Sequence, residues 1–215
     1  MRESFFTFDK PMKFNPSTHI PVMEHFYTIQ GEGFYTGHAA YFIRLAGCDV
    51  GCVWCDVKES WTVEEKQLML IDDLLKEVLK YPGRLIVITG GEPLMYDLSF
   101  LTQTLKANGF QINIETSGAY PISGELDWIC VSPKKFKAPL KEVLAKANEL
   151  KCIIFNKSDF EFAEQNCLLA TKDCVLYLQT EWSKQEQMLP LMIDYVKANP
   201  QWKISLQTHK YLNIP

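Results

Sequence analysis

The sequence has no excess of basic residues, no long hydrophobic run and no paired arrangement of cysteines. Its 215 residues include 22 Lys and Arg against 26 Asp and Glu, a formal net charge of -4. This balance argues against nucleic acid or an anionic membrane as the main partner and favours a small-molecule substrate. No apolar run approaches the roughly 20 residues that a membrane helix needs. The seven cysteines are odd in number and no basic-then-apolar leader follows Met1, so we expect neither a disulfide framework nor secretion, but a cytoplasmic protein.

Length and composition suit one domain, because 47% of the residues are hydrophobic and can supply a sizeable core. We expect a single domain over residues 1–215. Within it, residues 1–19 carry Pro11 and Pro16 and are predicted to be an extended lead-in. The core is predicted to begin at about residue 20.

Apolar segments alternate between strand and helix patterns along most of the chain. Strands are predicted at 41–46, 85–89, 110–114, 128–131, 152–155, 175–178 and 203–206, with 19–29 pairing at a sheet edge. Helices are predicted at about 70–79, 98–105, 140–150, 160–165 and 184–198, the last interrupted by Pro190. About six alternating units imply right-handed crossovers and a mainly parallel sheet. Because eight units do not fit, the predicted fold is α/β, a partial TIM-like β/α barrel of about six mainly parallel strands.

A polar motif directly follows each of the main predicted strands. In a parallel α/β sheet these ends lie on one face, where ligands bind. We therefore expect the motifs to share one site. They are the cysteine loop from Cys48, Gly90-Gly91-Glu92-Pro93, Glu115-Thr116-Ser117, Ser132-Pro133-Lys134, Gln179-Thr180-Glu181 and Gln207-Thr208-His209-Lys210.

Cys48, Cys52 and Cys55 form a C-x3-C-x2-C motif that indicates a metal centre. A closed structural zinc site needs four ligands, and the next cysteine along the chain is Cys130. An iron-sulfur cluster fits better, because three thiolates leave one iron open to a small molecule. A zinc-stabilised, non-enzymatic binding module, with His25 or His38 as a distant fourth ligand, stays as an alternative.

With Trp54 before its last cysteine, the motif resembles the signature of the radical S-adenosylmethionine (SAM) superfamily. The Gly90-Gly91-Glu92-Pro93 segment resembles a second family motif, in the family's order. The resemblance implies a [4Fe-4S] cluster whose open iron chelates SAM, and reductive cleavage to a 5′-deoxyadenosyl radical. It also implies a SAM pocket, formed by Trp54, Gly90, Gly91, Glu92, Glu115, Ser132 and Lys134, in which Glu115 binds the ribose.

Further segments, from about residue 20 to the C-terminus, resemble the 7-carboxy-7-deazaguanine synthases of that superfamily. These segments are Gln30-Gly31-Glu32-Gly33, Gly37, 42–48, Cys55-Asp56 and 88–94. The resemblance implies conversion of 6-carboxy-5,6,7,8-tetrahydropterin to 7-carboxy-7-deazaguanine with loss of ammonia, on the route to queuosine and other 7-deazapurines. Hydrogen abstraction from C6 would start the reaction. An electron donor such as flavodoxin or ferredoxin and a homodimer are implied as well.

The substrate of that family carries a carboxylate, which Arg44 could bind bidentately. The other expected substrate contacts are Gln30, Gly31, Glu32, Gly33, Gln207, His209 and Pro215. One departure concerns Mg²⁺, which the family holds through an aspartate and a following hydroxyl residue. Here Asp56 is followed by Val57, which has no side-chain oxygen for a hard cation; Ser60 or Lys58 could compensate.

A radical SAM activase that abstracts hydrogen from a glycine of a partner protein shares the three-cysteine signature and stays as a second alternative. The Gln30–Gly33 loop and Arg44 favour a small carboxylated heterocycle instead. The remaining cysteines, Cys130, Cys152, Cys167 and Cys174, lack paired spacing and are predicted to be core residues.

Overall fold

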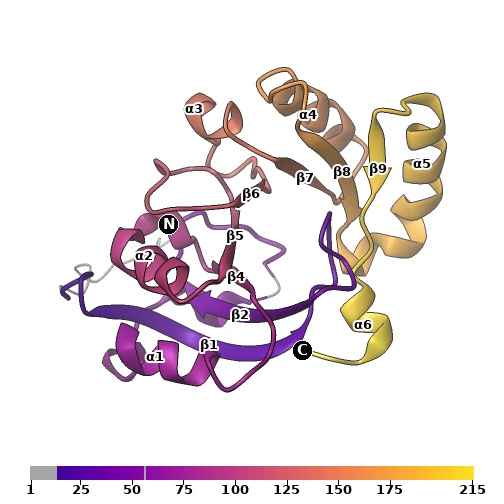
Figure 1. The fold of residues 1–215 in the computed structure, drawn as a ribbon. Coiled ribbons are helices and arrows are strands. Elements are labelled where there is room, and N and C mark those ends of the chain that lie inside the picture. The colour runs from indigo at the N-terminus through magenta and orange to yellow at the C-terminus, as the bar shows by residue number, and fades with distance from the viewer. Residues whose placement is uncertain (1–13, 56) are drawn as a thin grey trace, which may run out of the picture.

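The protein folds around one nine-stranded sheet with the strand order β3-β1-β2-β4-β5-β6-β7-β8-β9 (Figure 1). This computed structural model describes residues 14–55 and 57–215. From β2 to β9 neighbouring strands are parallel, whereas β1 is antiparallel to both β2 and β3. The strands are β1 His19–Ile29, β2 Ala39–Leu45, β3 Leu68–Leu70, β4 Leu85–Gly90, β5 Gln111–Thr116, β6 Trp128–Val131, β7 Glu149–Ile154, β8 Val175–Thr180 and β9 Trp202–Ile204.

Helices lie around the outside of the curved sheet, where Figure 1 shows them at its periphery. They are α1 Ile71–Val78, α2 Ser99–Ala107, α3 Lys141–Leu144, α4 Ser158–Cys167, α5 Gln185–Ala198 and α6 Thr208–Leu212. Each of α1, α2, α4 and α5 connects two parallel strands, as expected for right-handed crossovers. No helix among the described residues is long and apolar enough to cross a membrane.

The parallel strands alternate between an apolar outer face and a more polar inner face. On β4, Ile86 and Ile88 belong to the main core beneath the helices, while Leu85 and Val87 belong to a separate inner cluster. Because side chains along a strand alternate between the two faces, Arg44, Glu115 and other polar side chains at the strand ends point toward the interior. The cavity described below therefore opens at the carboxyl ends of the strands.

The prediction of an incomplete barrel with mainly parallel strands is confirmed, and two of its details differ. The helix expected at 140–150 ends at Leu144, because Asn148 pairs with Ile129 and brings β7 into the sheet from Glu149. The helix α5 passes through Pro190 without interruption. Proline removes one backbone hydrogen bond, and the buried Met188 and Met192 hold the helix against the sheet.

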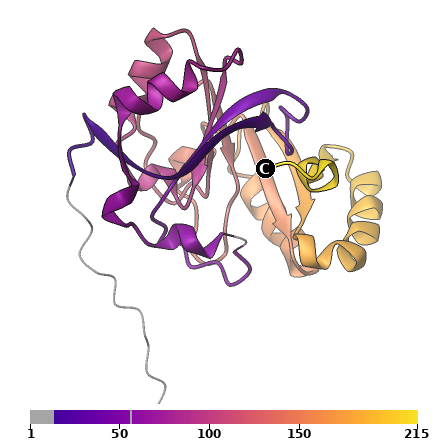
Figure 2. The same cartoon turned by 90° about the horizontal axis from the view of Figure 1, so that it is seen from below.

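The loop between β1 and β2 reaches across the open side of the barrel to β7 and the segment after β9. The backbone N–H of Gly33 donates to Ser205 Oγ at 2.9 Å, and that of Phe34 donates to Glu149 Oε2 at 3.3 Å. The helix α6 and the C-terminus lie beside this loop in both ribbon views (Figures 1 and 2). The first and last parts of the sheet thus meet through a loop rather than through strand pairing.

Candidate functional site

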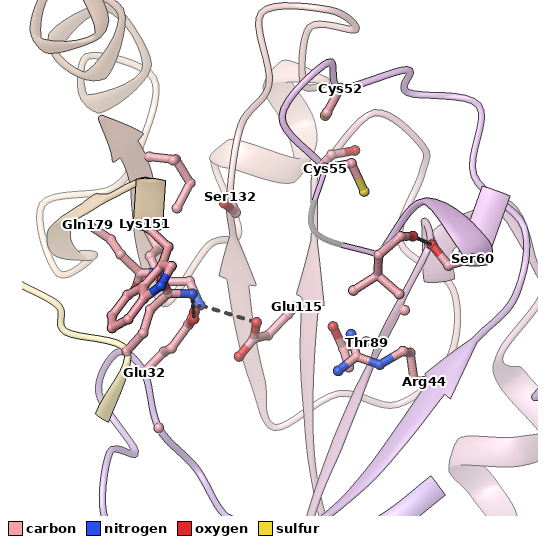
Figure 3. A pocket seen from close by; sticks show the side chains of 18 of the residues that line it. Glu32, Arg44, Cys52, Cys55, Ser60, Thr89, Glu115, Ser132, Lys151 and Gln179 are labelled. Atoms are coloured by element: carbon pink, nitrogen blue, oxygen red, sulfur yellow. Dashed lines mark hydrogen bonds and ion pairs between the residues drawn. The ribbon is translucent and has the colours of Figure 1, made fainter. Parts of the chain in front are cut away.

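A cavity of about 420 Å³ lies at the carboxyl ends of the strands. Figure 3 shows the cysteine loop on one side of it and Glu32, Lys151 and Gln179 on the other. Of the predicted site residues that the structure describes, all except Gly33 line it; Asp56 lies outside the described residues. The predicted residues that line it are Gln30, Gly31, Glu32, Arg44, Cys48, Cys52, Trp54, Cys55, Gly90, Gly91, Glu92, Glu115, Ser132, Lys134, Gln207, His209 and Pro215.

The three thiols lie on the loop that follows β2 and all border the cavity. Burial, reinforced by Glu92 and the neighbouring thiols, raises the pKa of Cys48 to about 11. Among the described residues, no three His, Cys, Asp or Glu side chains converge as a metal site. The donor set nevertheless suits an iron-sulfur cluster in type and number, since three cysteines border one cavity beside an open position.

The cysteine loop is tied to the rest of the protein through Asp49. Its carboxylate accepts hydrogen bonds from Lys137 Nζ at 2.8 Å and from the Tyr120 hydroxyl. Lys137 Nζ also donates to Tyr120 Oη at 2.7 Å. Although burial acts against ionisation, these two donors lower the pKa of Asp49. The contact fixes the loop against the segments that follow β5 and β6.

The turn after β4 packs directly against the cysteine loop because two glycines let the backbones approach. A Cβ atom on Gly91 would lie 2.1 Å from the Gly47 carbonyl oxygen and 2.9 Å from Cys48 Cβ. Gly90 has a φ of +133°, and its Cβ would lie 2.2 Å from the Leu45 oxygen. Larger residues at either position would therefore push the turn away from the thiols.

Glu92 is almost fully buried, at 1% exposure, and its carboxylate is already occupied by protein donors. Oε1 accepts from Leu94 N at 3.0 Å and Thr116 Oγ1 at 2.5 Å. Oε2 accepts from the backbone N–H and the hydroxyl of Ser117, at 2.8 and 2.5 Å. Glu92 thereby ties the turn after β4 to the end of β5, and each of its carboxylate oxygens has two protein donors.

Ser132 and Lys134 form the wall that follows β6. Lys134 Nζ donates to Ser132 Oγ at 2.6 Å and lies 5.4 Å from the ring centroid of Trp54. Burial lowers the pKa of Lys134. The three side chains therefore lie together at the cavity.

Opposite the cysteines, Lys151 of β7 joins two carboxylates that face the cavity. Its Nζ lies 2.5 Å from Glu32 Oε2 and 3.2 Å from Glu115 Oε2, and its side chain is 3% exposed. Burial opposes charge on both partners, but the Lys151 ammonium outweighs it and lowers the pKa of Glu32 to about 2. The two carboxylates likewise raise the pKa of Lys151 well above its usual value.

Two glutamines complete the hydrogen bonding of these carboxylates. Gln30 Nε2 donates to Glu115 Oε1 and Gln207 Nε2 donates to Glu32 Oε1, both at 2.9 Å. Gln179 also donates to Glu32 and accepts from Ser205 Oγ at 2.8 Å. Five elements therefore converge on one fixed polar wall.

The segment after β9 docks onto the β1–β2 loop at Gly31. The Gly31 carbonyl accepts from the Thr208 backbone N–H at 2.9 Å and from its hydroxyl at 3.0 Å. The His209 ring packs so closely that a Cβ on Gly31 would lie 2.3 Å from its Nδ1. Pro215 reaches the cavity edge, where its carbonyl oxygen accepts from Thr28 Oγ1 at 3.4 Å.

Arg44 enters the cavity from the end of β2, beside Thr89 of β4 (Figure 3). Its Nε lies 2.6 Å from Glu24 Oε1 on the paired strand β1, and its side chain is 23% exposed. The ion pair orients the guanidinium while its two terminal nitrogens remain suited to a carboxylate.

The region expected to hold Mg²⁺ offers few oxygen ligands. Val57 lines the cavity without a side-chain oxygen, and the buried Ser60 hydroxyl donates to the Val57 carbonyl at 2.7 Å. The described residues here do not fit a magnesium site.

Gly33 lies beneath the cavity, against Glu149 of β7, rather than in its lining. Glu149 Oε2 accepts from the Trp128 indole N–H at 2.9 Å and from the Phe34 N–H, whereas Oε1 is buried without a partner among the described residues. Burial raises the pKa of Glu149.

Neither histidine of the zinc alternative borders the cysteine loop. His25 Nδ1 lies 2.6 Å from the Tyr41 hydroxyl, and His38 Nδ1 lies 3.0 Å from the Tyr35 carbonyl oxygen. Neither lines the cavity that the thiols border, so neither is positioned as their fourth ligand.

The sequence analysis does not identify Lys151 as a site residue, and it places Gln179 in a strand-end motif and Thr89 in the 88–94 segment without a specific contact for either. The signal for Lys151 was a single charge within the apolar run Leu150 to Ile154. Because the helix is predicted to run to Leu150 and the next strand to begin at Cys152, the sequence analysis places Lys151 in neither element.

Comparisons with known proteins agree on one family. The family model described as the radical SAM superfamily matches residues 42–149. A 7-carboxy-7-deazaguanine synthase of Flavobacterium psychrophilum is 57% identical over 196 residues, which cover 91% of this chain and 93% of that protein. The enzyme of the same name from Escherichia coli K12 is 39% identical, over 90% of this chain and 98% of that protein.

A solved structure agrees with these relatives. The crystal structure of QueE from Escherichia coli superposes with a TM-score of 0.79 at 35% sequence identity. The match covers 88% of this chain and 94% of the other.

Proposed function

Because the chain belongs to the radical SAM superfamily and, within it, to the 7-carboxy-7-deazaguanine synthases, we propose that it converts 6-carboxy-5,6,7,8-tetrahydropterin to 7-carboxy-7-deazaguanine with loss of ammonia. The carrying observation is the single cavity that has three cysteines on one side and a wall of carboxylates and amides on the other. This makes it a carbon-nitrogen lyase of 7-deazapurine and queuosine biosynthesis.

Cys48, Cys52 and Cys55 are the proposed ligands of a [4Fe-4S] cluster. When bound, the cluster and SAM would supply the radical chemistry for hydrogen abstraction from C6 of the pterin. The tether from Asp49 to Lys137 keeps the cysteine loop beside the cavity. The role of the remaining residues is to bind and orient the two ligands.

The proposed SAM subsite extends from the turn after β4 to β6. Backbone carbonyls of Gly90 and Gly91 would accept from the amino group, since the Glu92 carboxylate is occupied by Thr116 and Ser117 and the Glu92 carbonyl accepts from the Met95 N–H at 3.1 Å. Glu115 would accept from the ribose hydroxyls, and Ser132 and Lys134 would close the pocket beside Trp54.

The proposed pterin subsite lies between Arg44 and the wall around Lys151. Arg44 would bind the substrate carboxylate, and the acceptor oxygens of Glu32 suit the N–H donors of the pterin edge. Gln30 and Gly31 of the β1–β2 loop, and Gln207, His209 and Pro215 after β9, would extend this wall. Gly33, which does not line the cavity, is not assigned a substrate contact.

Mg²⁺ belongs to the expected cofactor set through Asp56, which lies outside the described residues. The described neighbours Val57 and Ser60 do not fit such a site. Comparing turnover with and without Mg²⁺ therefore measures whether this chain needs the ion.

The broader proposal is a cytoplasmic, single-domain enzyme with a core from about residue 20 to 215. It would act as a homodimer and take its electron from a donor such as flavodoxin or ferredoxin. These proposals follow from the resemblance and from the composition of the chain.

The function is tested by anaerobic incubation of the reconstituted protein with SAM, a reductant and 6-carboxytetrahydropterin, read out by mass spectrometry. Formation of 7-carboxy-7-deazaguanine is the expected result. Accumulation of 5′-deoxyadenosine alone would retain the radical SAM chemistry and overturn the substrate, which would make a partner protein the next candidate. Zinc without sulfide in the purified protein would overturn both.

A further inference from the structure

We propose that Lys151 is a positioning residue that couples the cofactor subsite to the substrate subsite, by holding Glu115 and Glu32 on one shared ammonium group. The inference rests on the proposed function, in which Glu115 serves SAM and Glu32 serves the pterin. Lys151 itself is not assigned a contact with either reacting group.

The geometry gives Lys151 two acidic partners on different elements. Glu32 comes from the β1–β2 loop and Glu115 from the end of β5, while Lys151 projects between them from β7 (Figure 3). The nearer contact is to Glu32, at 2.5 Å against 3.2 Å for Glu115. Because both carboxylates contact the same ammonium group, moving or neutralising one of them changes the strength of the ion pair between Lys151 and the other.

The rest of the network leaves little freedom to compensate. The second oxygen of each carboxylate accepts from its own glutamine, Gln207 for Glu32 and Gln30 for Glu115. The Gln30 Oε1 in turn accepts from the Glu32 backbone N–H at 3.1 Å. A ligand that shifts either carboxylate must therefore act on Lys151 or break this chain of bonds.

Stability alone does not explain a lysine at this position. Replacing a buried ion pair by apolar residues of similar volume often costs nothing, and β7 is otherwise rich in apolar residues. The carboxylates are 16% and 23% exposed, toward the cavity, whereas the ammonium is 3% exposed. The arrangement presents the acceptors to ligands and keeps the cation behind them.

The decisive experiment measures cross-effects between the two subsites. Glu32→Gln and Glu115→Gln keep side-chain volume and remove one carboxylate each. Dissociation constants for SAM and for 6-carboxytetrahydropterin are measured by anaerobic calorimetry without reductant, in the reconstituted wild type, both variants and Lys151→Met. We expect Glu32→Gln to change SAM affinity, and Glu115→Gln to change pterin affinity, by about five-fold or more.

The cross-effects should vanish when Lys151 is absent. In the double variant Glu32→Gln/Lys151→Met, SAM should bind as it does to Lys151→Met alone, because the shared group is missing. Lys151→Arg should restore part of the coupling. Lys203→Met, an exposed lysine on β9, is the matched control and should bind both ligands like the wild type.

The inference is overturned if each glutamine variant affects only its own ligand, or if the cross-effects persist without Lys151. If Lys151→Met does not fold, the cross-effects are measured in the Lys151→Arg background, where they should be smaller than in the wild type; cross-effects of unchanged size there would overturn the inference. The SAM dissociation constants also distinguish a failure of this inference from a failure of the proposed function. A wild type that binds SAM but no pterin refutes the substrate, while the effect of Glu32→Gln on SAM still tests Lys151.

Discussion

Gly33 carries two constraints at once, one in its backbone and one in its surroundings. Its φ is +65°, and a Cβ atom would lie 2.0 Å from Glu149 Oε1. Gly37 in the same loop also has a positive φ, +89°, but no atom lies within 4 Å of its Cβ position. The two glycines therefore separate backbone strain from steric exclusion.

We expect Gly37→Ala to destabilise the fold by about 1–2 kcal/mol, the cost of a left-handed alanine. Gly33→Ala should cost about 1–3 kcal/mol more, because the new methyl group overpacks against a buried carboxylate. Urea unfolding of both variants measures the difference. Equal losses of unfolding free energy in the two variants would show that the Glu149 side chain moves away from the new methyl group at little cost.

Glu32 should make stability depend on acid pH. Its pKa is lowered from 4.5 to about 2 in the folded protein, since the charge and hydrogen bond of Lys151 and the hydrogen bonds of two glutamines outweigh its burial. A lowered folded-state pKa contributes stability that is complete above about pH 4.5 and is lost as pH falls toward 2. The contribution at neutral pH is on the order of 3 kcal/mol.

Glu32→Gln is therefore expected to unfold at lower urea concentration than the wild type at pH 7. The difference between the two urea midpoints should become smaller between pH 4.5 and 3. Glu77→Gln, which removes an exposed pair with Lys80, should change stability by less than about 1 kcal/mol. A gap for Glu32→Gln that stays constant over this pH range would contradict the assigned ionisation.

The short helix α6 depends on Gly31 for its place over the cavity. Two hydrogen bonds from Thr208 end on the Gly31 carbonyl, and the His209 ring fills the space where a side chain would stand. A five-residue helix has little stability of its own. Its docking therefore determines whether Gln207 and His209 face the site.

We expect Gly31→Ala to undock α6 while the cysteine loop stays intact. Hydrogen exchange of residues 206–215 should become faster, and the KM for the pterin should rise by about ten-fold or more, with iron content unchanged. Unchanged exchange in this segment would show that His209 adopts another rotamer and that the helix stays docked.

The chain ends where added residues would meet the cavity. Pro215 borders it and its carbonyl oxygen accepts from Thr28. A six-histidine extension after Pro215 should therefore raise the KM for the pterin, without changing SAM affinity, relative to the same extension before Met1. Equal kinetics for the two tagged proteins would place the C-terminus outside the substrate path.

The strand-end motifs could be predicted from the sequence because each follows an apolar run, such as Leu85 to Thr89, whose length and β-branched content favour a buried strand. What could not be predicted depends on contacts between distant segments. Lys151 is part of the site through its contacts with Glu32 and Glu115, which lie far from it in the chain. Strand β3 was not predicted, because no local pattern links Leu68–Leu70 to His19.

The hydrogen-bond partners of Glu92 could not be predicted from its motif either. The motif indicated a carboxylate for a ligand, and the structure gives that carboxylate to Thr116 and Ser117. Which partner a buried acid takes depends on the neighbouring strand rather than on its own motif.

For protein engineering, the occupied carboxylate of Glu92 would divide the proposed cofactor subsite into two kinds of wall. Contacts made by main-chain carbonyls of the turn after β4 could not be changed by exchanging side chains, and Gly90 and Gly91 leave no room to add one. Redesign toward cofactor analogues altered at the amino group would have to rebuild the backbone. In the proposed subsite, analogues altered at the ribose would face Glu115 and Ser132, whose side chains a mutant library can sample.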